Sequence, residues 1–98
     1  WLWPGFGENC RVLKWIYERV TGTGQAVESP IGFLPPPGAL DLKGLDITAA
    51  DLAELLSVNR ADWMKEIPDI TAHFNRLGAR LPQALRAELA ELERKIKA

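Results

Sequence analysis

Residues 21–45 carry so many glycines and prolines that no long helix or strand can form there. The breakers are Gly22, Gly24, Pro30, Gly32, Pro35, Pro36, Pro37, Gly38 and Gly44. This stretch therefore predicts an extended connector between two more regular parts of the chain. Ile31, Phe33 and Leu34 within it are too apolar for a free linker, so we expect them to pack on a neighbouring surface, for example as a short edge strand.

Before the connector, the spacing of the apolar residues predicts one amphipathic helix over about residues 9–20. Its apolar face is formed by Val12, Leu13, Ile16, Tyr17 and Val20. Asn9 stands where an N-cap residue is expected, and Gly22 stands where a glycine ends a helix. We therefore expect these apolar side chains to share one face of the helix.

After the connector, two capping patterns predict the starts of two helices. Thr48 with Asp51 at the third helical position matches a capping box, and the short helix behind it should end at Ser57 or a neighbour. Asn59 with Asp62 at the same spacing marks the start of the next helix.

The last two helices are predicted over residues 59–77 and 82–97. The apolar stripe of the first consists of Trp63, Ile67, Ile70, Phe74 and Leu77, and that of the second of Leu85, Leu89, Leu92 and Ile96. Pro68 removes a backbone donor inside the first stripe, so we expect either a kink or two shorter helices there. A short turn from Gly78 should join the pair as an antiparallel hairpin. The fold class is thus mainly α, with about four helices and a Pro/Gly-rich connector.

Charge and composition exclude several partners. The chain has 12 Lys and Arg against 13 Asp and Glu, so it lacks the basic surface that nucleic-acid binding requires. Its longest apolar run is far shorter than the roughly 20 residues that span a bilayer. No stretch resembles a signal peptide, so we expect an intracellular, cytoplasmic protein with neither nucleic acid nor membrane as partner. A single cysteine, Cys10, excludes an internal disulfide framework.

The most informative short segment is Trp3-Pro-Gly-Phe-Gly-Glu-Asn9, which places an aromatic ring between two glycines just before a helix. Glycine lets the backbone turn tightly, and the Asn9 carboxamide lies at the helix N-terminus near the Phe6 ring. This arrangement favours a seat for a flat polar ring such as a purine. The alternative is a plain aromatic corner of the core, and the residues alone leave both open.

His73 and Cys10 are weaker candidates for chemistry. His73 has no second His, Cys or close acid pair at the spacing of a metal site, so we expect a surface histidine. Cys10 has no histidine near it in sequence, and we expect an ordinary half-buried cysteine. Nothing in the chain predicts unaided catalysis, so no catalytic residue and no metal ligand is assigned.

The chain has no initiator methionine and opens within Trp1-Leu2-Trp3. Two tryptophans at a terminus that is normally frayed would expose a large apolar surface. We therefore expect this sequence to be a piece of a longer protein.

Three segments closely resemble the end of the GTP-dependent phosphoenolpyruvate carboxykinases. The first runs from Trp1 to Ile16 and contains the Trp-Pro-Gly-Phe-Gly-Glu-Asn sequence that forms part of the guanine pocket in that family. The others are Pro30-Ile-Gly-Phe-Leu-Pro35 and Ala39-Leu-Asp-Leu-Lys-Gly-Leu45. The resemblance continues more loosely through Trp63, Lys65-Glu66 and Leu81-Pro82, so it spans essentially the whole chain.

The resemblance implies a parent enzyme with a larger α/β fold that interconverts oxaloacetate and GTP with phosphoenolpyruvate, carbon dioxide and GDP. That lyase reaction uses Mn²⁺ or Mg²⁺ and serves chiefly gluconeogenesis. By position, Phe6 would stack on guanine, Trp1 would take the place of a second stacking aromatic, and Asn9 would hydrogen-bond the base edge. The family's metal ligands and catalytic loops all precede this segment, so the chain alone should be inactive.

Within a single C-terminal fragment, residues 1–98, the resemblance suggests three parts. Residues 1–20 would form the guanine-site loop and helix, residues 21–46 the connector, and residues 47–98 a helical cap. The partners would be the guanine nucleotide and the remainder of the enzyme, which is expected to be monomeric. The separated fragment could self-associate.

A free-standing all-α interaction module is the competing interpretation. In it, the stripe that includes Trp63 and Phe74 would dock a partner. Such a module would have no enzymatic activity.

Overall fold

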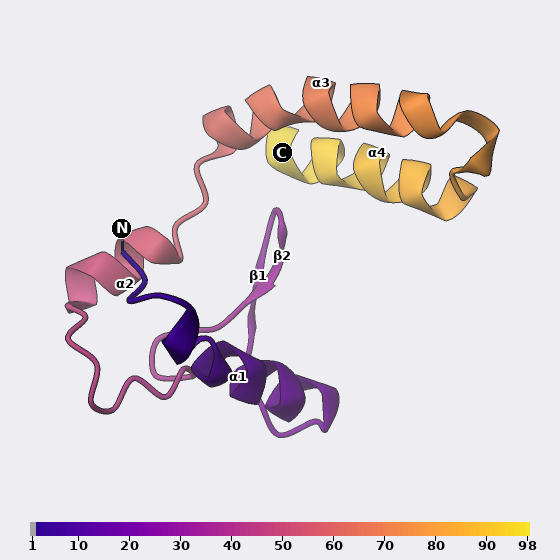
Figure 1. Cartoon of the computed structure of the whole chain (residues 1–98). Helices are drawn as coiled ribbons and strands as arrows, with labels where there is room; N and C mark the ends of the chain where they lie inside the picture. Colours follow the sequence, from indigo (N-terminus) through magenta and orange to yellow (C-terminus); the bar gives the residue numbers. More distant parts are fainter. Residues whose placement is uncertain (1) are drawn as a thin grey trace. The chain divides into compact units, whose positions relative to one another are not determined.

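The computed structural model describes residues 2–98 and is mainly helical, which confirms the predicted fold class at that level (Figure 1). The helices are the 3₁₀ turn η1 (Phe6–Glu8), α1 (Cys10–Val20), α2 (Ala49–Leu55), α3 (Arg60–Leu77), the 3₁₀ turn η2 (Gly78–Arg80) and α4 (Gln83–Lys97). Two short strands, β1 (Val27–Ser29) and β2 (Gly32–Leu34), lie within the predicted connector. The chain divides into two compact units, one up to Ser57 and one from Val58.

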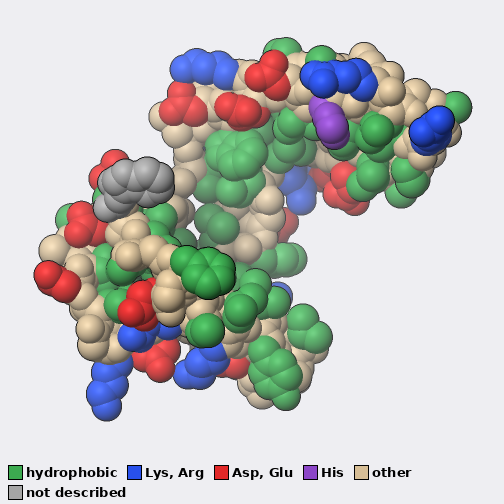
Figure 2. Space-filling view, viewed as in Figure 1, with side chains coloured by type: hydrophobic (Ala, Val, Ile, Leu, Met, Phe, Trp, Pro, Cys, Tyr) green, Lys and Arg blue, Asp and Glu red, His purple; other side chains and the backbone are tan. Residues whose placement is uncertain are grey.

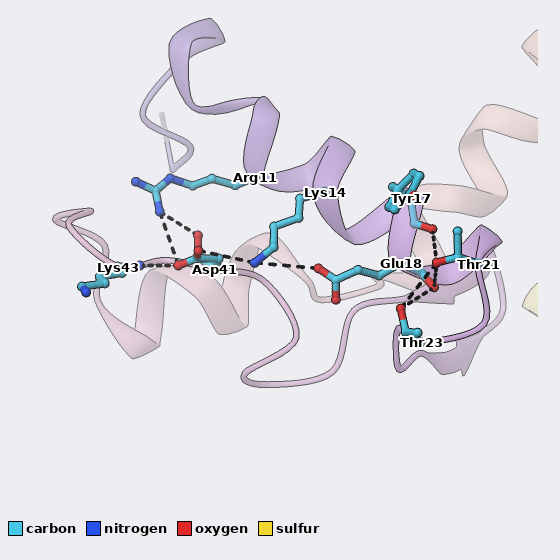
Figure 3. Close-up of polar contacts among 8 residues, drawn as sticks. All are labelled: Arg11, Lys14, Tyr17, Glu18, Thr21, Thr23, Asp41 and Lys43. Atoms are coloured by element: carbon cyan, nitrogen blue, oxygen red, sulfur yellow. Dashed lines mark hydrogen bonds and ion pairs between the residues drawn. The ribbon is translucent and has the colours of Figure 1, made fainter.

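In the first unit, α1 begins one residue later than Asn9 and ends at Val20. Asn9 takes the predicted N-cap position of α1, but it has helical backbone angles and its side chain makes no capping hydrogen bond. The preceding turn η1 already curls the chain in the helical sense, so no extended N-cap residue is needed. Gly22 follows the helix with φ +84°, as expected for a helix stop. The Thr21 hydroxyl donates to the carbonyl of Tyr17 at 2.9 Å at this end (Figure 3).

The connector contains an antiparallel β-hairpin in which Val27 pairs with Leu34 and Ser29 with Gly32. Gly32 has φ +130°, a conformation that favours glycine at the tight turn. The predicted strand is therefore present, but Phe33 is not covered by a neighbouring surface as expected, because the residue is 61% exposed. The Arg19 guanidinium lies 5.4 Å from the centre of the Phe33 ring, a cation–π contact on the surface.

The short helix α2 begins with the predicted capping box. The Thr48 hydroxyl accepts a hydrogen bond from the backbone N–H of Asp51 at 3.1 Å. The backbone N–H of Thr48 donates in return to the Asp51 carboxylate at 3.4 Å. Together the two bonds satisfy donors that a helix N-terminus leaves unpaired.

In the second unit, α3 and α4 lie side by side and run in opposite directions, as the hairpin prediction required (Figure 1). The Asn59 side chain caps α3 by accepting from the backbone N–H of Asp62 at 3.1 Å. Ile67 of α3 and Ile96 of α4 are buried. The Arg60 guanidinium at the start of α3 donates to the carbonyls of Lys95 and Ile96 at 2.6 Å and 2.9 Å. A cation therefore satisfies the carbonyl end of α4, where the helix dipole favours positive charge.

Pro68 does not divide the third helix. α3 continues from Arg60 to Leu77 with Pro68 inside it, so the expectation of two shorter helices is wrong. The proline is exposed, whereas Ile67 before it is buried and Ile70 after it is half-buried. Packing along this face therefore outweighs the loss of one backbone hydrogen bond.

Candidate functional site

The loop before α1 changes direction at a glycine. Gly5 has φ +120°, which side chains rarely allow, and the next three residues form η1. The backbone N–H of Glu8 donates to the Gly5 carbonyl at 3.1 Å, and that of Asn9 donates to the Phe6 carbonyl at 3.1 Å. These bonds hold the Phe6 backbone in a defined turn directly before the helix.

The Phe6 ring points away from the protein interior, and its side chain is 89% exposed. This contradicts the alternative of an aromatic core corner. Beside the ring lies an open, mostly apolar hollow of about 530 Å³, a size that small-molecule sites commonly have. The hollow is lined by Phe6, Gly7, Asn9, Cys10, Val12 and Leu13. A face of the ring is thus available for a planar ligand.

The Asn9 side chain has a partner that sequence reasoning missed. Its Oδ1 atom accepts a hydrogen bond from the indole Nε1–H of Trp3 at 2.9 Å. An indole nitrogen can only donate, so this contact fixes which end of the Asn9 amide is oxygen. Trp3 precedes Asn9 by six residues in the same loop, and no sequence pattern pairs the two side chains. Trp1, the second predicted stacking aromatic, lies outside the described residues.

A polar network ties the loop and α1 to the connector, and Figure 3 shows the part of it around Asp41. The Arg11 guanidinium donates from Nε to the Glu8 carboxylate at 2.8 Å and from Nη1 to the backbone carbonyl of Asp41 at 2.7 Å. The Asp41 carboxylate also lies 3.6 Å from the Lys14 ammonium. Arg11 therefore links η1, through Glu8, to a segment thirty residues away in sequence.

The pKa of Asp41 lies below its ordinary value, chiefly because the backbone N–H of Lys43 donates to its carboxylate at 3.2 Å. The positive charge of Lys14 adds to this lowering, and so to a smaller degree does that of Arg11. The carboxylate is therefore held in its charged form at the connector end of the network.

Cys10 and His73 take no part in a constellation that could perform catalysis. Cys10 lines the hollow but is exposed, so the expectation of a half-buried thiol is wrong. His73 lies on the exposed surface of α3, as predicted, with its ring centre 6.4 Å from that of Phe74. Across residues 2–98, no three His, Cys, Asp or Glu side chains lie together so that they could hold a metal ion. No helix in the described part of the chain is long and apolar enough to cross a membrane.

The fold and the hollow define a mainly helical segment that presents an aromatic ring and an oriented amide, as a wall of a ligand-binding site would. The family described as phosphoenolpyruvate carboxykinase C-terminal P-loop domain matches residues 1–95. The chain therefore belongs to the GTP-dependent phosphoenolpyruvate carboxykinase family. This membership supports the enzyme interpretation and not the free-standing interaction module.

Similar relatives come from distant organisms and share about half of their residues with this chain. The sequence is 52% identical to phosphoenolpyruvate carboxykinase [GTP] of Neocallimastix frontalis over 98 residues, which is 99% of this chain and 16% of that protein. It is 51% identical to the enzyme of the same name from Treponema pallidum, over 97% of this chain and 16% of the relative. It is 48% identical to the enzyme of the same name from Arthrobacter sp., over 96% of this chain and 15% of that relative. The chain thus spans about a sixth of the length of these relatives.

Proposed function

We propose that this chain supplies one wall of the guanine site of a GTP-dependent phosphoenolpyruvate carboxykinase. That enzyme interconverts oxaloacetate and GTP with phosphoenolpyruvate, GDP and carbon dioxide, and we propose a cytoplasmic role in gluconeogenesis. The observation that carries the proposal is the 89% exposed Phe6 ring beside an open hollow, in a chain that belongs to this family. Trp1 is included as a second stacking aromatic on the resemblance alone.

Stacking supplies affinity for the base without choosing between bases. A base on an aromatic ring gains roughly 1–3 kcal/mol, and every base offers such a face. Phe6 is suited to this role because Gly5 and η1 fix its backbone while its ring stays open to solvent. We infer that Phe6 binds any purine nucleotide and that Asn9 provides the preference for guanine.

Among the residues that line the hollow, Asn9 has a side-chain amide that can form hydrogen bonds with the edge of a base. A site built to hydrogen-bond one edge rejects the wrong base because its own polar groups are then left unpaired. Selection of the nucleotide, rather than bond making, is therefore the proposed contribution of this segment. The guanine nucleotide and the remainder of a monomeric enzyme are its proposed partners.

The divalent metal of the proposed reaction does not fit the described residues. Mn²⁺ and Mg²⁺ prefer clustered carboxylate and other oxygen ligands, and no such group exists within residues 2–98. We therefore derive no step of the phosphoryl transfer or the decarboxylation from this chain.

The proposal is tested by measuring GTP and ATP affinity of the intact enzyme with Phe6→Ala and with Asn9→Ala. Phe6→Ala should weaken both nucleotides by about 1–3 kcal/mol, because stacking is lost for either base. Asn9→Ala should weaken GTP far more than ATP. Phe33→Ala is the matched control, since it removes an exposed aromatic of the same unit outside the hollow. An unchanged GTP preference and affinity in both site variants would remove these residues from the pocket.

A further inference from the structure

The hydrogen bond between Trp3 and Asn9 assigns a role to a residue that does not itself line the hollow. Asn9 lines it, and the Asn9 Oδ1 atom is taken by the Trp3 indole N–H at 2.9 Å. The Asn9 amide oxygen thus already accepts a hydrogen bond from the protein. The Nδ2 atom at the other end of the amide keeps its two hydrogens available to donate. Among the described residues, no other side-chain hydrogen bond involves this amide.

We propose that Trp3 is a specificity-determining positioning residue, which holds the Asn9 carboxamide so that its Nδ2–H donors are presented to the base. The proposal rests on the proposed function, because it concerns the same guanine site. It adds that recognition of guanine depends on a donor whose orientation is fixed before the nucleotide arrives.

The donor end of the amide matches the chemistry that separates guanine from adenine. Guanine carries acceptors at O6 and N7, whereas adenine carries a donor amino group in place of O6. An Nδ2–H group can bond to O6 but meets the adenine amino group donor to donor. An amide free to rotate could instead offer Oδ1 to that amino group, and the discrimination would fall. The Trp3 bond prevents this rotation.

Trp3→Phe in the intact enzyme tests the proposal, because it removes the indole N–H and keeps an aromatic side chain. The chain offers a matched control in Trp15, whose indole N–H donates to the Gln25 carbonyl at 2.8 Å in the same unit, away from the hollow. Equilibrium affinities are measured for GTP, for ATP and for inosine triphosphate, whose base keeps O6 and N7 but lacks the 2-amino group.

For Trp3→Phe we expect GTP and inosine triphosphate to bind about tenfold more weakly, by equal factors, since one hydrogen bond loses its orientation. ATP affinity should rise, because the freed amide can offer Oδ1 to the adenine amino group, and kcat at saturating GTP should stay unchanged. Trp15→Phe should leave the ratio of GTP to ATP affinity as in the natural enzyme. Asn9→Asp, which keeps an acceptor for Trp3 but has no donor at neutral pH, should lose the GTP preference.

Two results would overturn the inference. In the first, Trp3→Phe weakens all three nucleotides equally, which marks a purely structural role. In the second, it matches Trp15→Phe in every affinity. Asn9→Ala separates this failure from that of the proposed function: if Asn9→Ala abolishes the GTP preference while Trp3→Phe does not alter it, only the role of Trp3 is lost. If Asn9→Ala also keeps the preference, the base site itself is misassigned.

Discussion

Asp41 shows how a single side chain can hold the connector against the first helix. Its carboxylate accepts from the backbone N–H of Lys43 at 3.2 Å and lies 3.6 Å from the Lys14 ammonium, while its backbone carbonyl accepts from Arg11. The pKa of the carboxyl is lowered from its ordinary 3.8, first by the Lys43 amide and then by the Lys14 charge. The folded state therefore favours the charged carboxylate more than the unfolded state does.

This lowered pKa predicts a specific dependence of stability on pH. The contribution of Asp41 is fully present above the unfolded value of 3.8 and is lost as pH falls through the lower folded pKa. Asp41→Asn should therefore lower the thermal midpoint at pH 7, and the curves of variant and natural chain should converge in acid. Thermal unfolding followed by circular dichroism across this pH range measures the difference.

High salt provides the control for the Asp41 prediction. The attraction between Asp41 and Lys14 is screened at about 1 M salt, where the Debye length is about 3 Å. The Lys43 amide still bonds more strongly to the charged carboxylate than to the neutral amide of the variant. The difference between variant and natural chain should therefore shrink but not vanish. Parallel pH profiles for the two proteins would contradict the role given to Asp41.

The residues of the candidate site were only partly predictable from sequence. The glycines around Phe6 indicated a presented ring, and the structure places that ring on the surface. The partner of Asn9 could not be predicted, because the same residue type at a helix start usually caps the backbone. The turn η1 removes that need, and the side chain is then free to accept from Trp3. The sequence pattern identified Asn9 as a candidate, but its hydrogen-bond partner depends on the geometry of the loop.

Among the elements, α3 is locally destabilised by Pro68. A proline inside a helix is about 3 kcal/mol less favourable than alanine, because it lacks the donor and crowds the preceding turn. Pro68 is exposed, so alanine there would remove no buried packing and would give the Met64 carbonyl a donor. Pro68→Ala should therefore stabilise the second unit by about 1–3 kcal/mol, as measured by chemical unfolding.

Pro82→Ala is the matched control for this prediction. Pro82 stands at the N-cap of α4 with φ −58° and ψ 138°, where a missing N–H removes no helical hydrogen bond. Its replacement should give no gain and should slightly destabilise, since alanine makes the unfolded chain more flexible. Equal stabilisation by both alanines would show that Pro68 is not the weak point of α3.

Element boundaries followed most closely from sequence where a side chain caps the backbone. Thr48 and Asn59 mark the starts of α2 and α3 because their oxygens satisfy orphan backbone donors, a purely local interaction. Strand β1 was not predicted, because Val27–Ser29 has no alternating pattern and pairs only once β2 lies beside it. The sequence left open whether α3 continues through Pro68, since its continuity depends on packing against α4.

At the scale of the whole molecule, the apolar face of α1 is largely uncovered. The sequence places the apolar residues of this helix on one face, and Tyr17 and Val20 on that face are 69% and 81% exposed. Figure 2 shows hydrophobic side chains at the surface in this part of the first unit. An uncovered apolar stripe on one helix favours association.

We therefore expect the 98-residue chain, prepared by itself, to self-associate as its concentration rises. Tyr17→Glu places a charge on the exposed apolar face of α1 and should shift the distribution toward monomer in sedimentation velocity. Ala87→Glu adds the same charge at an exposed position of α4, outside that face, and should leave the distribution unchanged. A natural chain that stays monomeric at high concentration would contradict this prediction.

The exposed thiol in the hollow has a practical consequence for work on this protein. Cys10 is the sole cysteine of these 98 residues and shares the hollow with Phe6 and Asn9. Alkylating reagents react with accessible thiolates, so occupancy of the hollow can be followed as protection of one peptide from covalent labelling. Chemical footprinting thus becomes available at the candidate site without engineering a reporter into the chain.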